Sequence, residues 1–176
     1  DKSVSRGLGD VYKRQAMISN VLIVRENDKL QSTLDVIEDI ESRWKDIECV
    51  DTQDWSNPVP SFVNQLWNMI QLSKIITMGA LKRDEFRGSH YKPEFDLNQP
   101  DDFDPADYLE YEEQKANGGV HKDQFAPSHV VYMERFEKNN EDWLKSSIAT
   151  YNNGKPAVDF ESVDTSLIAP RPRKYD

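Results

Sequence analysis

The clearest pattern in the chain is a helical repeat of apolar residues between positions 28 and 47. Apolar side chains recur at steps of three and four residues, while acidic residues and Lys45 fall on the opposite face. This spacing predicts an amphipathic helix that is capped by Asp28 and packs one face against one partner. The apolar positions are Leu30, Leu34, Ile37, Ile40, Trp44 and Ile47.

A longer helix is predicted from about Ser61 to Arg83, after a turn-rich connector at 51–58 in which Asn57-Pro58 disfavours helix. Its apolar residues cover more than one side. Such a helix is expected to be central, packed against two neighbours or against another domain, with its aromatic and methionine residues in the core. One face holds Phe62, Leu66, Met69, Ile76 and Ala80, and Trp67, Ile70, Leu72, Ile75 and Met78 spread around it.

Residues 96–137 are acidic. Asp104 followed by Pro105 is a strong helix start and predicts a short helix through about Gln114. Residues 115–120, which contain two glycines, are expected to end this helix. The acidic residues lack the glycine and spacing of an EF-hand calcium loop. His121 and His129 are eight residues apart with no third ligand at metal spacing, so we expect surface histidines and no zinc site.

The C-terminal part alternates between apolar and polar residues at 143–151 and 157–163, on either side of Asn153-Gly154. This pattern predicts a β-hairpin with Asn-Gly in its turn. Residues 167–173 contain two spaced prolines and are expected to be extended, either lying on a neighbour or mobile. The predicted fold is therefore mainly α: a bundle of about three helices, an acidic insertion, a β-hairpin and an extended tail.

Composition narrows the function classes. A formal net charge of −10 argues against a nucleic-acid partner, with residues 171–174 as the one basic exception. The single cysteine, Cys49, excludes an internal disulfide and any all-cysteine metal or iron–sulfur site within the chain. No Gly-x-Gly-x-x-Gly motif follows a predicted strand, and no apolar run is long enough to span a membrane.

Residues 1–15 (DKSVSRGLGDVYKRQ) are polar and basic, without periodicity, and the pattern changes sharply at Ala16. They look like translated adapter sequence, with a disordered native tail as the alternative. In either case we expect these residues not to pack.

The most concentrated polar stretch follows the long helix, at residues 81–95 (LKRDEFRGSHYKPEF). It combines arginines, acids, a histidine and a tyrosine with Gly88, which can adopt a left-handed conformation. The pattern fits a helix C-cap with solvated charges and equally a docking surface. The candidate site residues are Arg83, Glu85, Arg87, His90 and Tyr91.

This stretch resembles the Arg-x-Glu-Ser-Arg-Gly-Ala-His-Tyr signature in the C-terminal helical domain of succinate dehydrogenase and fumarate reductase flavoprotein subunits. L-aspartate oxidase shares the signature more loosely. Phe86 replaces the usual serine, which removes a hydroxyl, and Ser89 replaces the usual alanine. The resemblance covers 17–95, in which 17–25 would end the first helix, and 138–176. It is carried outside the signature by residues 20–25, 55–57, 62–69, 140–145 and 163–168.

The resemblance implies a parent enzyme that interconverts succinate and fumarate on covalently bound FAD. The parent would pass electrons to an iron–sulfur subunit, with a membrane anchor subunit as an indirect partner, at the cytoplasmic face of the inner membrane. Flavin attachment and substrate-binding residues would lie upstream. No catalytic, cofactor-binding or metal-binding residue is then expected in this chain, and Arg83, Glu85, Arg87, His90 and Tyr91 would dock it onto the flavin domain.

The expected organisation is a leader at 1–15, the helical domain at 16–95, an insertion at 96–137, and the hairpin and tail at 138–176. Two other interpretations fit the sequence less well. One is a free-standing acidic helical adaptor that binds a partner protein through the central helix, and the other is a fragment of L-aspartate oxidase. Continuation of the reading frame upstream of residue 16 would distinguish the enzyme from the adaptor.

Overall fold

The computed structural model describes residues 13–47, 53 and 55–174. Cys49, most of the leader and part of the 51–58 connector lie outside these residues. The chain divides into two compact units. The first contains residues 13–94 and 147–160 among those described, and the second contains 95–146 and 161–174. The elements are predominantly helical with one two-stranded sheet, so the mainly α prediction is confirmed.

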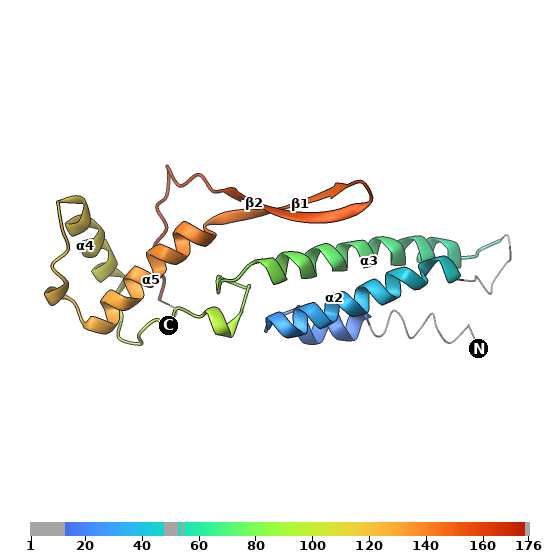
Figure 1. Ribbon diagram of the computed structural model, residues 1–176, viewed down its shortest axis with the longest axis horizontal. Helices are drawn as coiled ribbons and strands as arrows, with labels where there is room; N and C mark the ends of the chain where they lie inside the picture. Colours follow the sequence, from blue (N-terminus) through green and yellow to red (C-terminus); the bar gives the residue numbers. More distant parts are fainter. Residues whose placement is uncertain (1–12, 48–52, 54, 175–176) are drawn as a thin grey trace. The chain divides into compact units, whose positions relative to one another are not determined.

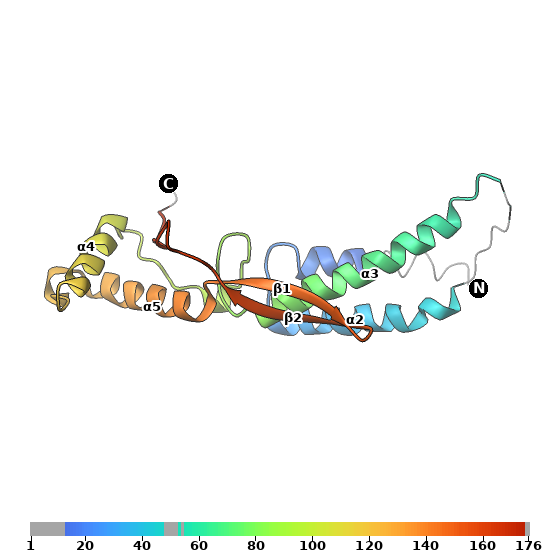
Figure 2. The ribbon, with the colours of Figure 1, turned by 90° about the horizontal axis from the view of Figure 1, so that it is seen from above.

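The first unit is built around α2 (Asn27–Ser42) and α3 (Val59–Lys82), which lie side by side (Figures 1 and 2). A short 3-10 turn, η1 (Arg43–Asp46), extends α2. A further helical segment at 13–20 places Met17 against the apolar side chains of both helices. The long helix therefore packs against two helical neighbours. The residues in these two contacts are Val21, Leu30, Ile37, Ile40, Leu66, Ile70 and Ala80.

Several boundaries and faces differ from the sequence predictions. α2 begins at Asn27, with Glu26 at the N-cap position, so Asp28 lies in the first turn and is not the cap. α3 begins at Val59, because the Asn57 side chain accepts the Val59 N–H and starts the helix earlier than expected. The first helical segment ends at residue 20 and not at 25. Lys13 is 3% exposed within that segment, so the expectation that the leader does not pack is wrong for this residue.

The buried face of α3 also differs from the predicted one. It includes Ser73 and Thr77, while Phe62, Leu72 and Ile76 are exposed. Thr77 satisfies its hydroxyl by donating to the Ser73 carbonyl, 2.8 Å away, which is why a polar residue can lie in this contact. Leu72 and Ile76 instead line a shallow groove with Ile18.

The second unit is organised by α4 (Pro105–Ala116) and α5 (Pro127–Trp143), joined through the 3-10 turn η3 (Lys122–Gln124). Asp104 caps α4 by accepting the Ala106 N–H at 2.9 Å, which confirms the predicted helix start. α5 was not predicted, and Trp143 ends it where a strand was expected to begin. The core between these elements is rich in aromatic residues: Phe103, Tyr108, Tyr111, Phe125, Val130, Tyr132, Met133 and Phe136.

The hairpin consists of β1 (Lys145–Asn152) and β2 (Lys155–Ser162), paired with each other in a two-stranded sheet (Figure 1). Asn153 and Gly154 form its turn with φ of +52° and +77°. Positive φ at both central residues defines the type I′ turn that favours Asn-Gly. The predicted hairpin and its turn are confirmed. A 3-10 turn, η2 (Pro93–Phe95), follows the polar stretch at 83–92.

Candidate functional site

The polar stretch at 83–92 forms a tight loop directly after α3. Arg83 leaves the helix with an extended backbone, and Arg87 and His90 exchange two backbone hydrogen bonds of 3.1 and 3.0 Å. Gly88 lies inside this turn at φ +58°, a conformation that favours glycine. Tyr91 then pairs with Val24 in a parallel bridge, so the loop returns to the segment that precedes α2.

A buried carboxylate lies at the base of the loop. Glu85 is 0% exposed, and its two oxygens contact the guanidinium groups of Arg83 and Arg87. The Arg87 Nε lies 2.8 Å from Glu85 Oε2. Arg83 also donates to the Ser147 hydroxyl and lies over the Phe160 ring, 5.9 Å from its centroid. Burial of this acid is tolerated because charge-assisted hydrogen bonds satisfy both oxygens.

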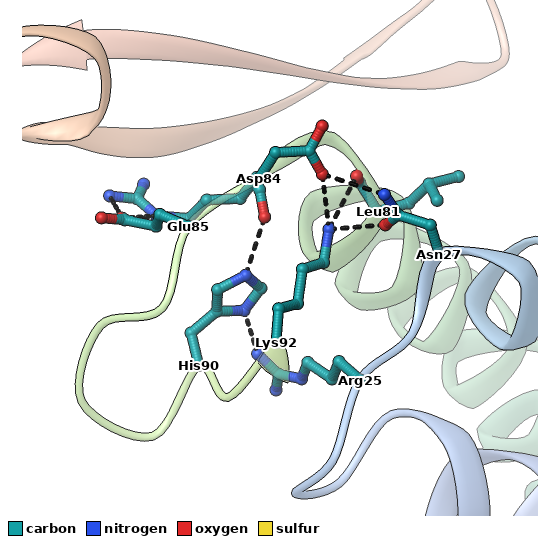
Figure 3. A network of polar contacts seen from close by, with 8 residues as sticks. Arg25, Asn27, Leu81, Asp84, Glu85, His90 and Lys92 are labelled. Atoms are coloured by element: carbon teal, nitrogen blue, oxygen red, sulfur yellow. Dashed lines mark hydrogen bonds and ion pairs between the residues drawn. The ribbon is translucent and has the colours of Figure 1, made fainter. Parts of the chain in front are cut away.

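The His90 ring has partners at both nitrogens. Nε2 lies 2.8 Å from the Arg83 carbonyl oxygen, and Nδ1 contacts the guanidinium of Arg25 (Figure 3). Burial lowers the pKa of His90, the hydrogen bond to the Arg83 carbonyl opposes this, and the positive charge of Arg25 lowers the pKa further. The ring is therefore neutral near pH 7, with its proton on Nε2.

A second polar cluster surrounds the Lys92 ammonium group. Its Nζ lies 2.7 Å from Asn27 Oδ1, 2.8 Å from Asp84 Oδ1 and 3.1 Å from the Leu81 carbonyl oxygen, as Figure 3 shows. The Lys92 side chain is 0% exposed. The cluster joins the start of α2 to the end of α3, where a positive charge is also favoured by the helix dipole.

The structure brings four of the five predicted site residues, Arg83, Glu85, Arg87 and His90, into one connected network. Tyr91 lies at its edge and packs against Phe86, with ring centroids 4.9 Å apart. Phe86 thus fills the position where the signature has serine with an aromatic contact. Sequence reasoning missed Arg25, Asn27, Asp84 and Lys92. The one available signal was the lysine that follows the signature, close to a helix C-terminus.

A separate cluster in the second unit centres on His129. Its Nδ1 lies 2.9 Å from Asp107 Oδ2 and its Nε2 lies 3.3 Å from Asp102 Oδ1. Burial alone would lower the pKa of His129, but the hydrogen bond to Asp107 and the charge of Asp102 raise it above its usual value. His129 is 7% exposed, so the expectation of a surface histidine is wrong here, whereas His121 is exposed.

The side chains of the described residues do not form a metal centre. In this part of the chain, no group of three or more histidine, cysteine, aspartate or glutamate side chains is arranged to hold a metal ion. Across the same residues, no helix combines the length and the apolar character needed to cross a membrane.

Comparison with known proteins identifies the family. The family described as "Fumarate reductase flavoprotein C-term" matches residues 13–175. The succinate dehydrogenase flavoprotein subunit of Bacillus subtilis is 35% identical over 161 residues, which cover 90% of this chain and 21% of the relative. One subunit of the CoM/CoB fumarate reductase of Methanothermobacter marburgensis is 31% identical over 87 residues, 49% of this chain and 16% of the relative.

An uncharacterized FAD-dependent oxidoreductase of Methanocaldococcus jannaschii is 33% identical over 82 residues, 47% of this chain and 14% of that protein. No solved structure matches this chain. The chain spans about a fifth or less of the length of these relatives. The match over residues 13–175 shows that the chain belongs to the fumarate reductase flavoprotein C-terminal domain family.

Proposed function

We propose that the chain is the C-terminal part of a flavoprotein subunit that interconverts succinate and fumarate. The observation that carries this proposal is the 35% identity to the Bacillus subtilis subunit over 90% of the chain. The family match includes the whole polar loop and the hairpin. The parent enzyme would pass electrons to an iron–sulfur subunit, with a membrane anchor subunit as an indirect partner, at the cytoplasmic face of the inner membrane.

In this proposal, FAD is bound by the part of the subunit that precedes these residues. The sequence has no dinucleotide-binding glycine motif, and the described residues contain one two-stranded sheet in place of a parallel sheet that could hold a flavin pyrophosphate. The contribution of this chain is mechanical: it supports the flavin domain and offers surface to the partner subunit. Residues 96–137 would be an insertion into this scaffold.

Docking onto the flavin domain is assigned to the loop that carries Arg83, Glu85, Arg87, His90 and Tyr91. Gly88 and Ser89 are exposed at its tip, and the Arg87 side chain is 34% exposed. Two side chains near the tip fix the conformation of the loop. Glu85 pairs with Arg83 and Arg87, and His90 contacts Arg25. A loop fixed in this way can present a guanidinium group and an aromatic ring with little loss of entropy on docking.

A hybrid subunit tests the proposal. Residues 13–176 would replace the matching C-terminal segment of the Bacillus subtilis subunit, and the purified hybrid would be assayed for bound flavin and succinate-dependent dye reduction. We expect the hybrid to retain bound flavin and succinate-dependent dye reduction. Arg87→Ala should reduce them, while Arg43→Ala, which changes an exposed arginine at the end of α2 paired with Asp39, should not.

The hybrid also separates the proposal from its main competitor. A free-standing adaptor has no reason to complete a flavoprotein, so a hybrid that folds but neither keeps flavin nor reduces dye would contradict the assignment. Flavin absorbance or dye reduction by the isolated chain would contradict the proposed division of labour between this segment and the upstream domain.

A further inference from the structure

The register of the hairpin determines which backbone groups point outward. The turn pairs Asn152 with Lys155, and at the other end the Val163 N–H donates to the Leu144 carbonyl at 3.4 Å. Both pairs fit a single antiparallel register, in which even-numbered residues of β1 bond to odd-numbered residues of β2. From Ser147 onward, the odd-numbered residues of β1 therefore direct their N–H and C=O groups to the outer edge: Ser147, Ala149 and Tyr151.

The two outer edges of the hairpin differ in how they are protected. On β2, Pro156 has no N–H, the Val158 carbonyl accepts from Lys82 Nζ at 2.8 Å, and Asp159 and Glu161 carry charge. Proline, charge and coverage are the means by which proteins block strand edges. From Ser146 to Asn152, β1 has neither charge nor proline. Only the edge of β1 is chemically open to another strand.

Exposure shows the same asymmetry. By the register, Ala149 and Val158 lie opposite each other on the same face of the ribbon. Val158 is 3% exposed, whereas Ala149 is exposed. β2 thus contacts the end of α3 through Val158, while the Ala149 side chain of β1 is open to solvent. Among the described residues, the outward backbone groups of Ser147, Ala149 and Tyr151 make no backbone hydrogen bond to another segment.

We propose that the outer edge of β1 pairs with an extended strand from the part of the flavoprotein polypeptide that this chain does not contain. The inference rests on the proposed function and adds a specific contact to it. A two-stranded ribbon is marginally stable in water, so a third strand would stabilise it. The added strand would be uncharged or apolar where it faces Ile148 and Tyr151, which are 37% and 60% exposed.

Area and charge favour a segment of the same polypeptide over a second copy of the chain. Eight residues of strand give an edge roughly 26 Å long, which buries less than the roughly 800 Å² per partner of a stable association between separate proteins. A covalently linked segment overcomes this through its high effective concentration. Two copies, each with a formal charge of −10, would also repel each other.

Amide hydrogen exchange in the hybrid subunit tests the proposal with an internal control. The inward amides of Ile148 and Thr150 are bonded to β2 whether or not the edge is covered. The outward amides of Ser147, Ala149 and Tyr151 are protected only if another strand binds. We expect at least about tenfold protection at the outward amides as well as the inward ones.

Protection at the inward amides alone would overturn the proposal. Rapid exchange at both sets would overturn it too, because the ribbon would not be formed in the subunit. Outward protection that depends on protein concentration would identify a second copy and contradict the stated partner. Dye reduction by the same sample reports separately on the proposed function, so the two can fail independently.

A proline pair gives a second readout. Ala149→Pro removes an outward N–H of β1, and Ser162→Pro removes an outward N–H at the exposed end of β2. If a strand covers β1, Ala149→Pro should lower the melting temperature of the hybrid and Ser162→Pro should change it much less. Equal effects would contradict the proposal.

Discussion

The guanidinium group of Arg25 contacts Nδ1 of His90, although the two residues are 65 positions apart in the sequence. Nε2 of the same ring lies 2.8 Å from the Arg83 carbonyl oxygen. A carbonyl only accepts, so Nε2 carries the proton and Nδ1 accepts from Arg25. The neutral imidazole therefore links the segment that precedes α2 with the loop that follows α3.

Protonation of His90 should weaken this link. Burial lowers the pKa of His90 in the folded chain, and an unfolded histidine titrates near about 6.5. As the pH falls, the unfolded state binds its proton first, so the contribution of His90 to stability is full above about pH 6.5 and declines toward the folded pKa. Urea unfolding between about pH 6.5 and pH 5, where the contribution of His129 is already complete, should show this decline, and His90→Gln should reduce it. An unchanged slope in the variant would contradict the assignment.

His129 should titrate in the opposite direction. Its two carboxylate partners raise its pKa, so its contribution to stability is complete below about pH 6.5 and is lost as the pH rises through the folded value. An NMR titration of the three histidines should give His129 a pKa above that of exposed His121, and His90 a pKa below it. A His129 value at or below that of His121 would show that Asp102 and Asp107 do not hold the protonated ring.

Lys92→Met should destabilise the first unit strongly. The substitution leaves Asn27, Asp84 and the Leu81 carbonyl without their shared donor, which should lower the free energy of unfolding by about 2–3 kcal/mol. The loss is smaller than for a fully buried ion pair because Asp84 is partly exposed. The matched control is Lys29→Met, which removes an exposed pair with Glu26 and should cost less than about 0.5 kcal/mol. Chemical unfolding of both variants tests the difference, and similar losses would show that burial of Lys92 is unimportant.

Gly154→Ala and Gly79→Ala should have opposite effects. Gly154 has φ +77° in the hairpin turn, where an added Cβ costs about 1 kcal/mol. Gly79 lies inside α3, where a Cβ would meet no atom within 4 Å, so alanine there should stabilise the chain by about 0.5–1 kcal/mol. Thermal unfolding of the two variants, each compared with the unchanged chain, tests this prediction. Effects of the same sign would contradict the described turn or helix.

Local rules predicted the parts of the fold that local chemistry determines. Asp104-Pro105 starts α4, Asn153-Gly154 turns the hairpin, and the apolar repeat from Leu30 to Ile40 forms the buried face of α2. α5 was not predicted because its apolar repeat, at Val130, Met133 and Phe136, covers only about two turns. The end of the helix that follows is polar and rich in asparagine and acidic residues.

The polar loop at 83–92 could be located from the sequence, but the contacts that its side chains make with distant residues could not. Arg25 and Asn27 are each 65 residues from the side chains they contact, His90 and Lys92, and no spacing rule relates such positions. The burial of His129 likewise depends on how α4 and α5 pack. The buried face of α3 includes Ser73 and Thr77, and the Thr77 hydroxyl is satisfied inside the helix by the Ser73 carbonyl. A pattern of hydrophobic residues alone does not predict that such polar residues are buried.

The most direct test of the central claim is the DNA sequence upstream of the codon for Ala16, recovered by long-read sequencing of the source. We expect an open frame that continues upstream into a dinucleotide-binding glycine motif and a flavin-linking histidine. If the source DNA lacks the codons for residues 1–15 and has a stop codon shortly before Met17, the claim would be contradicted, because the chain would then be a small protein with no flavin domain to support.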